Sequence, residues 1–465
     1  MSAKAKKKQS NTSWGGRFKT PPARGAQAFT ASIGFDIRLY PYDIRASIAH
    51  AEMLAQVKIL STPDAKKIVA GLRQVEKEIE SGAFKPGVED EDIHMAVERR
   101  LREKIGAVGA KLHAARSRND QVITDVRLFT KDAIRDIDAG IAELQSALVA
   151  VAAAHLDAVM PGYTHMQRAQ PVLLGHHLLA YHDMLSRDRG RLGDCFVRTD
   201  VLPLGAGAIA GTTLPIDRAF VAKTLGFARI AENSMDAVSD RDFIAELLAA
   251  AAILFAHLSR LAGEIVLWAT SEYGFVTLHD AYSTGSSMMP QKKNPDIAEL
   301  VRGKSGRVYG NLVSLLTTMK GLPLAYNSDL QEDKEPLFDT VDTANASLRT
   351  LAAMIRSLRF NTARMKDAAS DGFLLATDLA EYLVAAGTPF REAHEITGRI
   401  VLHCLERGIS PTDLSLDEFR KFSKAFSRDL LALLTAEQAV ARRKTIGGTS
   451  GVNVRRRLAE LKKKK

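Results

Sequence analysis

The sequence predicts an all-α protein whose centre is a bundle of unusually long helices. Apolar residues recur at helical spacing along most of the chain, and few segments alternate with period two. Several helical patterns are far longer than the mean helix of about 11 to 12 residues. We expect such helices over residues 124–160, 171–192, 236–272, 298–316 and 332–358. The pattern over 243–268 is apolar on nearly every side, so other helices must bury it, including helices from further copies of the chain.

Turn signals and shorter helical patterns at both ends of the chain predict three domains. We place soft boundaries near residues 116 and 366. An N-terminal helical domain spans 1–115, and its residues 1–12 form a basic, disordered tail. The central long-helix bundle spans 116–366, and a small helical domain spans 367–465.

Composition favours a cytoplasmic protein outside the membrane. The longest purely apolar stretch, residues 247–256, is well short of the roughly 18 residues that a membrane span needs. No apolar region follows the basic residues near the start, so we expect no secretory signal. Two cysteines, Cys195 and Cys404, are too few for a disulfide framework and form no C-x-x-C metal or redox pattern.

The formal net charge of +10 raises the question of nucleic-acid binding. The charge is concentrated at the ends, because residues 1–24 carry +7 and residues 442–465 carry +9, which leaves 25–441 with −6. We interpret both ends as frayed, solvated tails rather than as a binding surface. We therefore predict no nucleic-acid partner.

The segment GAGAIA, residues 205–210, matches the dinucleotide-binding pattern G-x-G-x-x-A. It follows Leu202-Pro203-Leu204 rather than a convincing strand, and no alternation of strands and helices surrounds it. We interpret this segment as a tight turn between helices.

The strongest chemical signal is YSTGSSMMPQKKNP, residues 282–295, which lies between two buried helices and is unsuited to regular structure. We expect a loop with Gly285 as its hinge. Ser286 or Ser287 becomes a useful base only if its alkoxide is stabilised, for which Lys292 and backbone N–H groups are available. The same composition also fits solvated lysines and serines that cap the following helix.

Two more polar segments stand beside long helices. GYTHMQRAQP, residues 162–171, joins two of them and is unusually polar for a junction next to so much buried surface. ARSRNDQ, residues 115–121, precedes another and offers hydroxyl, guanidinium and amide donors suited to a carboxylate, although Asn119 or Asp120 also fits a helix cap.

The loop at 282–295 resembles the signature of the fumarase, aspartase and argininosuccinate lyase superfamily. Its PQKKNP wording is similar to the argininosuccinate lyase branch, and the resemblance extends from WGGRF at residues 14–18 to the region of Gly447. It implies β-elimination of argininosuccinate to arginine and fumarate, the last step of arginine biosynthesis, without metal or organic cofactor. It also implies a homotetramer whose sites are shared between subunits.

The resemblance assigns catalytic roles to Ser286 as the base, Lys292 as the lysine that faces substrate, and His165 at the general acid/base site. Glu299 would orient and charge His165, although by spacing alone it is an ordinary acid in the first turn of a helix. The implied substrate ligands are Ser32, Asp36, His94, Ser117, Arg118, Asn119, Thr164, Asn294, Tyr326, Gln331 and Lys334. We interpret the acidic run at residues 89–92 as a solvated turn.

Three alternatives remain open. Adenylosuccinate lyase, fumarase and aspartase share the serine loop, and the family also contains lens crystallins that use this fold structurally. Gln291, Lys292 and the Arg118-Asn119 pair favour argininosuccinate among the enzymes. Nucleic-acid binding through the basic tails is the third alternative, and it predicts a steeply salt-dependent affinity.

Overall fold

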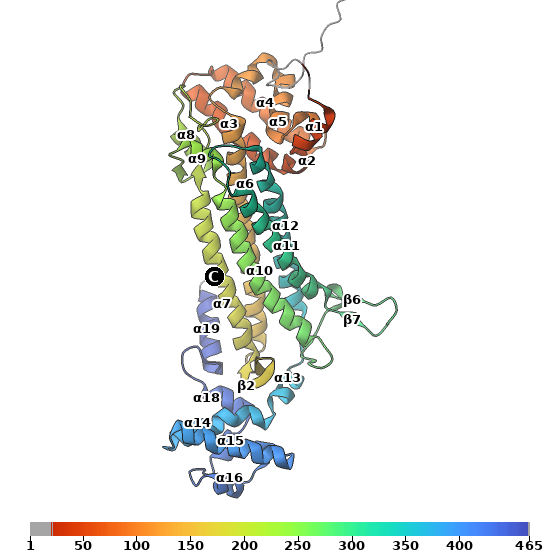
Figure 1. Ribbon diagram of the computed structural model, residues 1–465, viewed down its shortest axis with the longest axis vertical. Helices are drawn as coiled ribbons and strands as arrows, with labels where there is room; N and C mark the ends of the chain where they lie inside the picture. Colours follow the sequence, from red (N-terminus) through yellow and green to blue (C-terminus); the bar gives the residue numbers. More distant parts are fainter. Residues whose placement is uncertain (1–19, 21, 464–465) are drawn as a thin grey trace, which may run out of the picture. The chain divides into compact units, whose positions relative to one another are not determined.

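The computed structural model describes residues 20 and 22–463, and the chain is 70% helical (Figure 1). The all-α prediction is therefore confirmed. The strands of the described residues form short two-stranded sheets, β1 with β2, β3 with β4, β5 with β8 and β6 with β7. The predicted tail at residues 1–12 and the WGGRF segment lie outside the described residues.

The chain packs into two compact units. Unit 1 comprises the residues up to Arg135 together with Gly193–Leu248 and Gly310–Asp339. Unit 2 comprises Asp136–Leu192, Ala249–Tyr309 and the residues from Thr340 onward. The division into three domains near residues 116 and 366 stays a prediction.

Long helices supply the framework, as their apolar periodicity predicts. They are α6 (Arg118–Ala154), α7 (Leu174–Thr199), α10 (Asp242–Trp268), α11 (Asp296–Met319) and α12 (Lys334–Ser357). The helix predicted over 236–272 is divided into α9 and α10, because Asp240 leaves the helical conformation and its carboxylate accepts the backbone N–H of Asp242.

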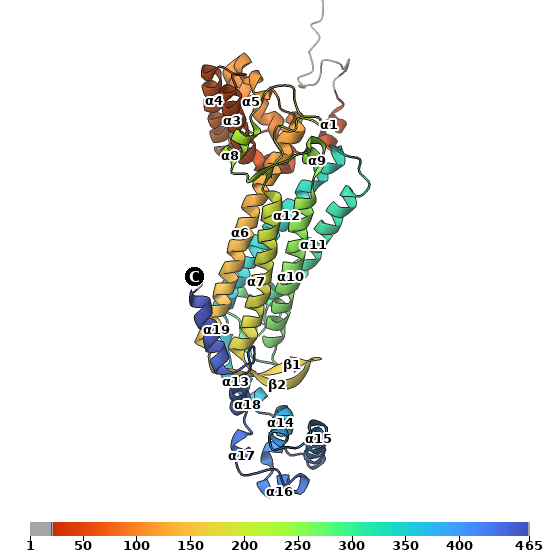
Figure 2. The same ribbon diagram turned by 90° about the vertical axis from the view of Figure 1, so that its left-hand side faces the viewer.

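Unit 1 contains the shorter helices of the N-terminal part. They are α1 (Arg24–Thr30), α2 (Ile33–Asp36), α3 (Tyr40–Gln56), α4 (Thr62–Glu80), α5 (Ile93–Ile105), α8 (Arg218–Leu225) and α9 (Ser234–Ser239). Helices α3, α4 and α5 lie side by side (Figure 2), and apolar residues such as Leu54, Leu72 and Leu101 are buried on them. The unit also holds β3 (Val201–Leu202) and β4 (Arg229–Ile230), which pair in parallel.

Short 3-10 helices connect many of these elements. They are η2 (Ile37–Leu39), η3 (Val88–Asp90), η4 (Gly106–His113), η5 (Asp280–Tyr282), η6 (Ser328–Asp333), η7 (Gly372–Leu375) and η8 (Pro411–Asp413). Residues 205–210 form a turn between α7 and α8, as we predicted in place of a dinucleotide site. Gly207 has φ 63°, and a Cβ there would lie 2.7 Å from the carbonyl oxygen of Gly211.

Unit 2 contains the remaining strands and the C-terminal helices. The strands are β1 (Val159–Thr164), β2 (Gln167–Leu173), β5 (Val276–Thr277), β6 (Thr284–Gly285), β7 (Lys293–Asn294) and β8 (Arg359–Phe360). The C-terminal helices are α13 (Thr362–Ala369), α14 (Ala376–Ala385), α15 (Phe390–Arg407), α16 (Leu416–Phe422), α17 (Leu430–Leu433), α18 (Ala436–Arg442) and α19 (Gly451–Lys463).

The β1–β2 hairpin replaces the ends of two predicted helices. Helix α6 ends at Ala154 and α7 begins at Leu174, while residues between them pair as antiparallel strands with an irregularity near Gly162. A Cβ at Gly162 would lie 2.9 Å from the carbonyl oxygen of Gln170, so this close strand approach suits glycine. Each strand contains a proline and the pairing is irregular, so the sequence shows no clear period of two here.

Our interpretation of residues 442–465 as a frayed tail is wrong for residues 451–463, which form α19. Val454 and Leu458 are one turn apart on this helix and are buried in a cluster with Ala152, Val159 and Leu173. The basic residues occupy the other face, and Arg457 pairs with Asp183 at 2.7 Å. The many basic residues of this segment therefore concealed, in the sequence, the narrow apolar stripe of Val454 and Leu458.

Two helices, Arg118–Ala154 and Asp242–Trp268, are long and apolar enough to cross a membrane by length and composition. Their most apolar windows have mean hydropathies of 1.4 and 1.6, and 44% and 50% of these windows are buried within the chain. Core helices of a bundle pass the same test, and helix α6 also buries charged residues such as Asp125 and Lys131.

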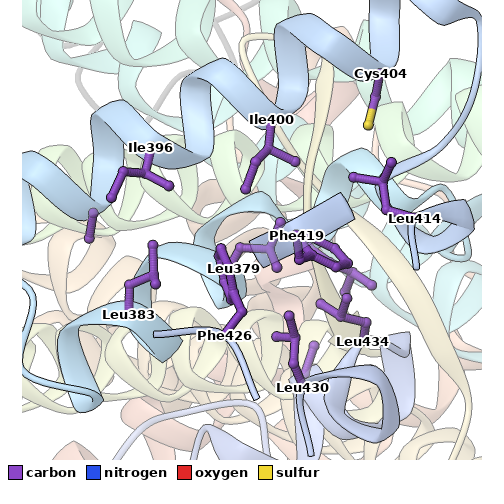
Figure 3. Close-up of a cluster of buried hydrophobic side chains, with 13 residues drawn as sticks. Leu379, Leu383, Ile396, Ile400, Cys404, Leu414, Phe419, Phe426, Leu430 and Leu434 are labelled. Atoms are coloured by element: carbon purple, nitrogen blue, oxygen red, sulfur yellow. The ribbon is translucent and has the colours of Figure 1, made fainter. Parts of the chain in front are cut away.

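Helices α14 to α17 enclose a separate apolar core at the C-terminal end of unit 2 (Figure 3). Leu379, Ile400, Phe419 and Phe426 are fully buried in it, and the Phe419 and Phe426 rings lie 5.2 Å apart. Such a core stabilises these short helices, which would be marginal in isolation.

We predict that Ile400→Ala lowers the free energy of unfolding of this region by about 2–5 kcal/mol, because it leaves a cavity among well-packed side chains. Hydrogen exchange of the amides of α15 in urea measures the loss. Leu402→Ala is the matched control, since Leu402 is on the same helix but 55% exposed, and its cost should stay within about 0.5 kcal/mol. Equal costs for the two variants would contradict the role of the core.

Candidate active site

Polar side chains from distant parts of unit 1 line one narrow cleft. Seven of the predicted substrate ligands lie there, namely Ser32, Asp36, Arg118, Asn119, Tyr326, Gln331 and Lys334. Thr30, Glu91, Asp92, Val122 and Arg241 complete the lining. The cleft therefore offers both cationic and acidic groups to a small ligand.

Asp36 is a buried carboxyl group at the wall of the cleft. The Ser32 hydroxyl donates to Asp36 Oδ2 at 2.6 Å, and the backbone N–H of Ile93 donates to Oδ1 at 3.1 Å. Burial raises the pKa of Asp36 to about 7, with a further contribution from Asp92, while Ser32 and Lys334 act in the opposite direction. Asp36 can therefore exchange a proton near neutral pH.

Arg118 forms the cationic side of the cleft. Its Nη1 lies 2.7 Å from Glu91 Oε1 and 3.3 Å from Asp92 Oδ2. Burial alone would lower the pKa of Arg118, but the two carboxylates outweigh burial and raise it.

Our interpretation of residues 89–92 as a solvated turn is wrong, because Asp90 and Asp92 are buried. Asp92 caps α5 by accepting the N–H of Met95, a spacing that the sequence does contain.

Lys334 and Arg241 share one buried carboxylate. Lys334 Nζ donates to Asp333 Oδ1 at 2.8 Å, and Arg241 pairs with the other oxygen of Asp333. All three side chains are nearly inaccessible to solvent within the described chain. Sequence reasoning missed Arg241, because its only signal is a charged residue in the polar break between two helices.

Asp120 holds the segment that carries Arg118 and Asn119. Its carboxylate accepts the backbone N–H groups of Ser117 at 2.9 Å, Gly205 at 3.0 Å and Gly207 at 2.8 Å. The Ser117 hydroxyl accepts the N–H of Asn119 at 3.2 Å. Ser117 is thus the cap of α6, in place of Asn119 or Asp120 as one of our alternatives had it, and Asp120 in the first turn accepts the N–H of this cap. The Ser117 hydroxyl is turned to the backbone rather than to the cleft.

His94, a predicted substrate ligand, does not line the cleft. Its side chain is 1% exposed, and its Nδ1 lies 2.7 Å from Asp43 Oδ1. A buried histidine oriented by a carboxylate has a defined tautomer. Its role as a substrate ligand stays a prediction.

His165 lies at the tip of the β1–β2 hairpin in unit 2. Thr164 pairs with Gln167, so His165 and Met166 alone make the turn, with φ values of 50° and 61°. Two consecutive positive φ values are typical of a type I′ turn, where asparagine and glycine are preferred. Positive φ values are unfavourable for histidine and methionine, so the backbone is strained here, and such strain is often found at functional sites. Thr164 and His165 are both exposed within this chain.

The serine loop of unit 2 is a loop, as predicted, and a short antiparallel pairing closes its base (Figure 1). Thr284 pairs with Asn294 and Gly285 with Lys293, and the hydroxyl of Thr284 donates to Asp296 at 2.6 Å. Ser286 lies directly after this pairing. Its Oγ accepts the backbone N–H groups of Met288 at 3.2 Å and Met289 at 3.0 Å.

Lys292 and Glu299 are exposed in this chain, and Asn294 donates to the Thr284 hydroxyl at 3.3 Å. Glu299 lies in the first turn of α11. Among the residues that the structure describes, no hydrogen bond or ion pair joins His165, Ser286 and Glu299 to one another. The catalytic roles of Ser286, His165, Lys292 and Glu299 stay predictions.

Comparison with known proteins identifies the family of the chain. The sequence matches the family model described as Lyase over residues 16–310 and the model described as Argininosuccinate lyase C-terminal over 373–441. The argininosuccinate lyase of Symbiobacterium thermophilum is 57% identical over 446 residues, which cover 96% of this chain and 97% of that protein. That of Moorella thermoacetica is 56% identical, with 94% of each chain covered.

Solved structures show the same architecture. EDDS lyase in complex with formate is 32% identical with a TM-score of 0.84, covering 92% of this chain and 86% of that one. The class II fumarase from Schistosoma mansoni has a TM-score of 0.78 at 16% identity, covering 90% and 95%, which shows the fold alone. The helical fold and the matched models together define a lyase. The chain belongs to the argininosuccinate lyase family.

We predict that Asp36→Asn changes how stability depends on pH. The pKa of Asp36 is raised from 3.8 to about 7 in the folded chain, so the protonated carboxyl group stabilises the folded state. This stabilisation is present below about pH 4 and is lost as the pH increases to about 7. Asparagine cannot ionise. The free energy of unfolding of the variant minus that of the parent should therefore rise between about pH 4 and pH 7, by up to about 1.4 kcal/mol per unit, and then level off. Urea unfolding measured across this range tests it, and a constant difference would contradict the assignment.

Proposed function

We propose that the chain catalyses the β-elimination of argininosuccinate to arginine and fumarate, the last step of arginine biosynthesis. The observation that carries the proposal is the cleft of unit 1, which gathers seven side chains expected of an argininosuccinate site. The high identity to argininosuccinate lyases over nearly the full chain supports the same substrate.

The charges of the cleft suit this substrate. Argininosuccinate carries several carboxylates and a guanidinium group, so it needs both cationic and acidic partners. Arg118 can bind a carboxylate through two parallel hydrogen bonds, and Lys334 adds a second cation. Asp36 and Glu91 supply acceptors for the basic end.

In the proposed mechanism Ser286 removes a proton from the Cβ of the succinyl part. A serine acts as a base only if its alkoxide is stabilised. The two backbone N–H groups that donate to Ser286 Oγ would stabilise that negative charge, because fixed donors aimed at a developing anion lower the barrier. Lys292, six residues further along the loop, adds a positive charge.

The carbanion then delocalises into the adjacent carboxylate. Lys292, Asn294 and Thr164 are the proposed donors to that carboxylate, since each carries an N–H or O–H group. The bond between Cα and the guanidinium nitrogen breaks as the double bond of fumarate forms. His165, oriented by Glu299, is the proposed acid that protonates the leaving nitrogen. All of these steps use side chains of the protein, and no cofactor or metal takes part.

We further propose that the chain works as a homotetramer whose sites are shared between subunits. His165 is exposed within one chain, and among the described residues no hydrogen bond or ion pair joins it to Ser286 or Glu299. Helix α11 also exposes large apolar side chains along its length, including Leu300, Tyr309, Val313 and Leu316. Contiguous exposed apolar surface of this kind is typical of subunit interfaces.

We place this tetramer in the cytoplasm, away from membranes and nucleic acid. Cys195 and Cys404 are both free and buried, which suits a reducing compartment. The basic residues of α19 are partly used in ion pairs with acidic residues such as Asp183 and Asp157. These pairs reduce the charge that the C-terminal end could offer to a phosphate backbone.

Absorbance of fumarate during incubation with different substrates tests the reaction class. We expect rapid release from argininosuccinate and none of comparable rate from adenylosuccinate, malate or aspartate. Faster turnover of another substrate would indicate a different lyase of the superfamily. No turnover of any of them by the assembled protein would favour a structural role like that of the crystallins.

We predict that Ser286→Ala lowers kcat about 10²–10⁴-fold with little change in substrate binding, because it removes the base and leaves the cleft intact. Ser287→Ala is the matched control, since it alters the neighbouring hydroxyl of the same loop, and its kcat should stay near that of the parent. Steady-state kinetics and equilibrium binding separate the two effects. An unchanged kcat for Ser286→Ala would exclude the assignment.

Complementation tests the shared sites. We expect His165→Asn and Ser286→Ala to be inactive alone and to recover activity when mixed under conditions of subunit exchange, because some mixed sites contain neither substitution. Native mass spectrometry verifies the exchange. If mixed tetramers form and remain as inactive as the parents, each site is built by one subunit.

A further inference from the structure

Three potential metal ligands meet at the side of α5, outside the cleft. They are His94, Glu98 and His113, and one ligand atom of each lies within 4.8 Å of the others. His94 and Glu98 are four residues apart on the same helix, so their side chains share one face. His113 comes from the end of η4, which packs against α5.

His94 is prepared to act as a ligand. Its Nδ1 lies 2.7 Å from Asp43 Oδ1, and a neutral imidazole that donates from Nδ1 carries its lone pair on Nε2. Nε2 has no hydrogen-bond partner in the described structure, although the side chain is 1% exposed. A buried polar atom without a hydrogen-bond partner is costly, so a ligand at this nitrogen would be favourable.

The other two groups face that nitrogen. Glu98 Oε2 lies 3.9 Å from His94 Nε2 and 3.0 Å from His113 Nδ1. The separation of 3.9 Å between two acceptor atoms is too long for a hydrogen bond but leaves room for a cation between them. His113 is 47% exposed, which gives an ion a route from solvent.

We propose that His94, Glu98 and His113 form a binding site for a divalent transition-metal ion of the Zn²⁺ class. Two imidazoles and one carboxylate are a ligand set that Zn²⁺ prefers, with a water molecule at the fourth position. Asp43 supplies the carboxylate that orients a metal-binding histidine from behind. His113 releases Nδ1 by moving its proton to the solvent side of the ring.

Binding of the ion would join α5 to η4, which lies shortly before the cleft residues Arg118 and Asn119 in the sequence. Residues 106–113 directly precede the segment that carries Arg118 and Asn119. An ion that binds the folded form alone stabilises it by mass action. Metal binding should therefore increase the thermal stability of the chain, which gives a readout that is independent of catalysis.

The experiment uses the full-length chain without a histidine tag, after removal of metal by a chelator. Titration with Co²⁺ is followed by visible absorption, because tetrahedral Co²⁺ absorbs strongly, and Zn²⁺ is then added as competitor. We expect one equivalent to bind per chain, displacement by Zn²⁺, and a higher Tm with either ion. His113→Ala and Glu98→Gln should each weaken binding at least about tenfold.

His394→Ala is the matched control, because His394 is an exposed helical histidine in a different part of the chain. It should bind Co²⁺ as the parent does. The Tm of each variant without metal verifies that folding is unchanged. If His113→Ala is unstable, the test depends on Glu98→Gln alone. Binding by His113→Ala and Glu98→Gln that is as strong as binding by the parent chain, or binding that never saturates at one equivalent, would overturn the proposal.

Discussion

The buried carboxylate of Asp120 is the interaction on which the geometry of the cleft depends. It accepts three backbone N–H groups, one from Ser117 and two from the turn at Gly205 and Gly207. Burial raises the pKa of Asp120, so the three donors must compensate the lost hydration of the charge. One side chain thereby fixes both the start of α6 and a turn 85 to 87 residues away. Arg118 and Asn119 take their positions from this arrangement.

The long helices could be predicted because their signal is local and repeated. Apolar side chains at helical spacing identify α11 and α12 to within about three residues at each end, whereas the pattern over 236–272 did not reveal the break between α9 and α10. The β1–β2 hairpin could not be predicted in this way, since a register shift between Pro161 and Tyr163 interrupts the alternation of its side chains. Helix α19 was missed for the opposite reason, because ten basic residues near the end of the chain concealed the apolar pair Val454 and Leu458.

Some residues of the candidate site could likewise be predicted from local sequence, and others could not. Motifs in the sequence locate residues of the serine loop and of the segment at Arg118, since unusual polar composition beside apolar helices is itself a signal. Arg241 and the buried Asp92 carry no such signal, because their importance depends on partners such as Asp333 that are distant in sequence. The pairing of His94 with Asp43, 51 residues apart, likewise appears only when α3 and α5 pack together.

The tip of the β1–β2 hairpin shows what a rigid turn requires. Glycine at His165 and Met166 would relax their positive φ values, but it would also let the tip sample many backbone conformations. Residues with side chains have fewer accessible states, so the turn is strained by roughly 1–3 kcal/mol at each residue and is nevertheless well defined. Conformational precision at the imidazole is thus obtained at the expense of stability. If His165 has the role proposed above, substitutions that relieve this strain would stabilise the chain and lower its activity.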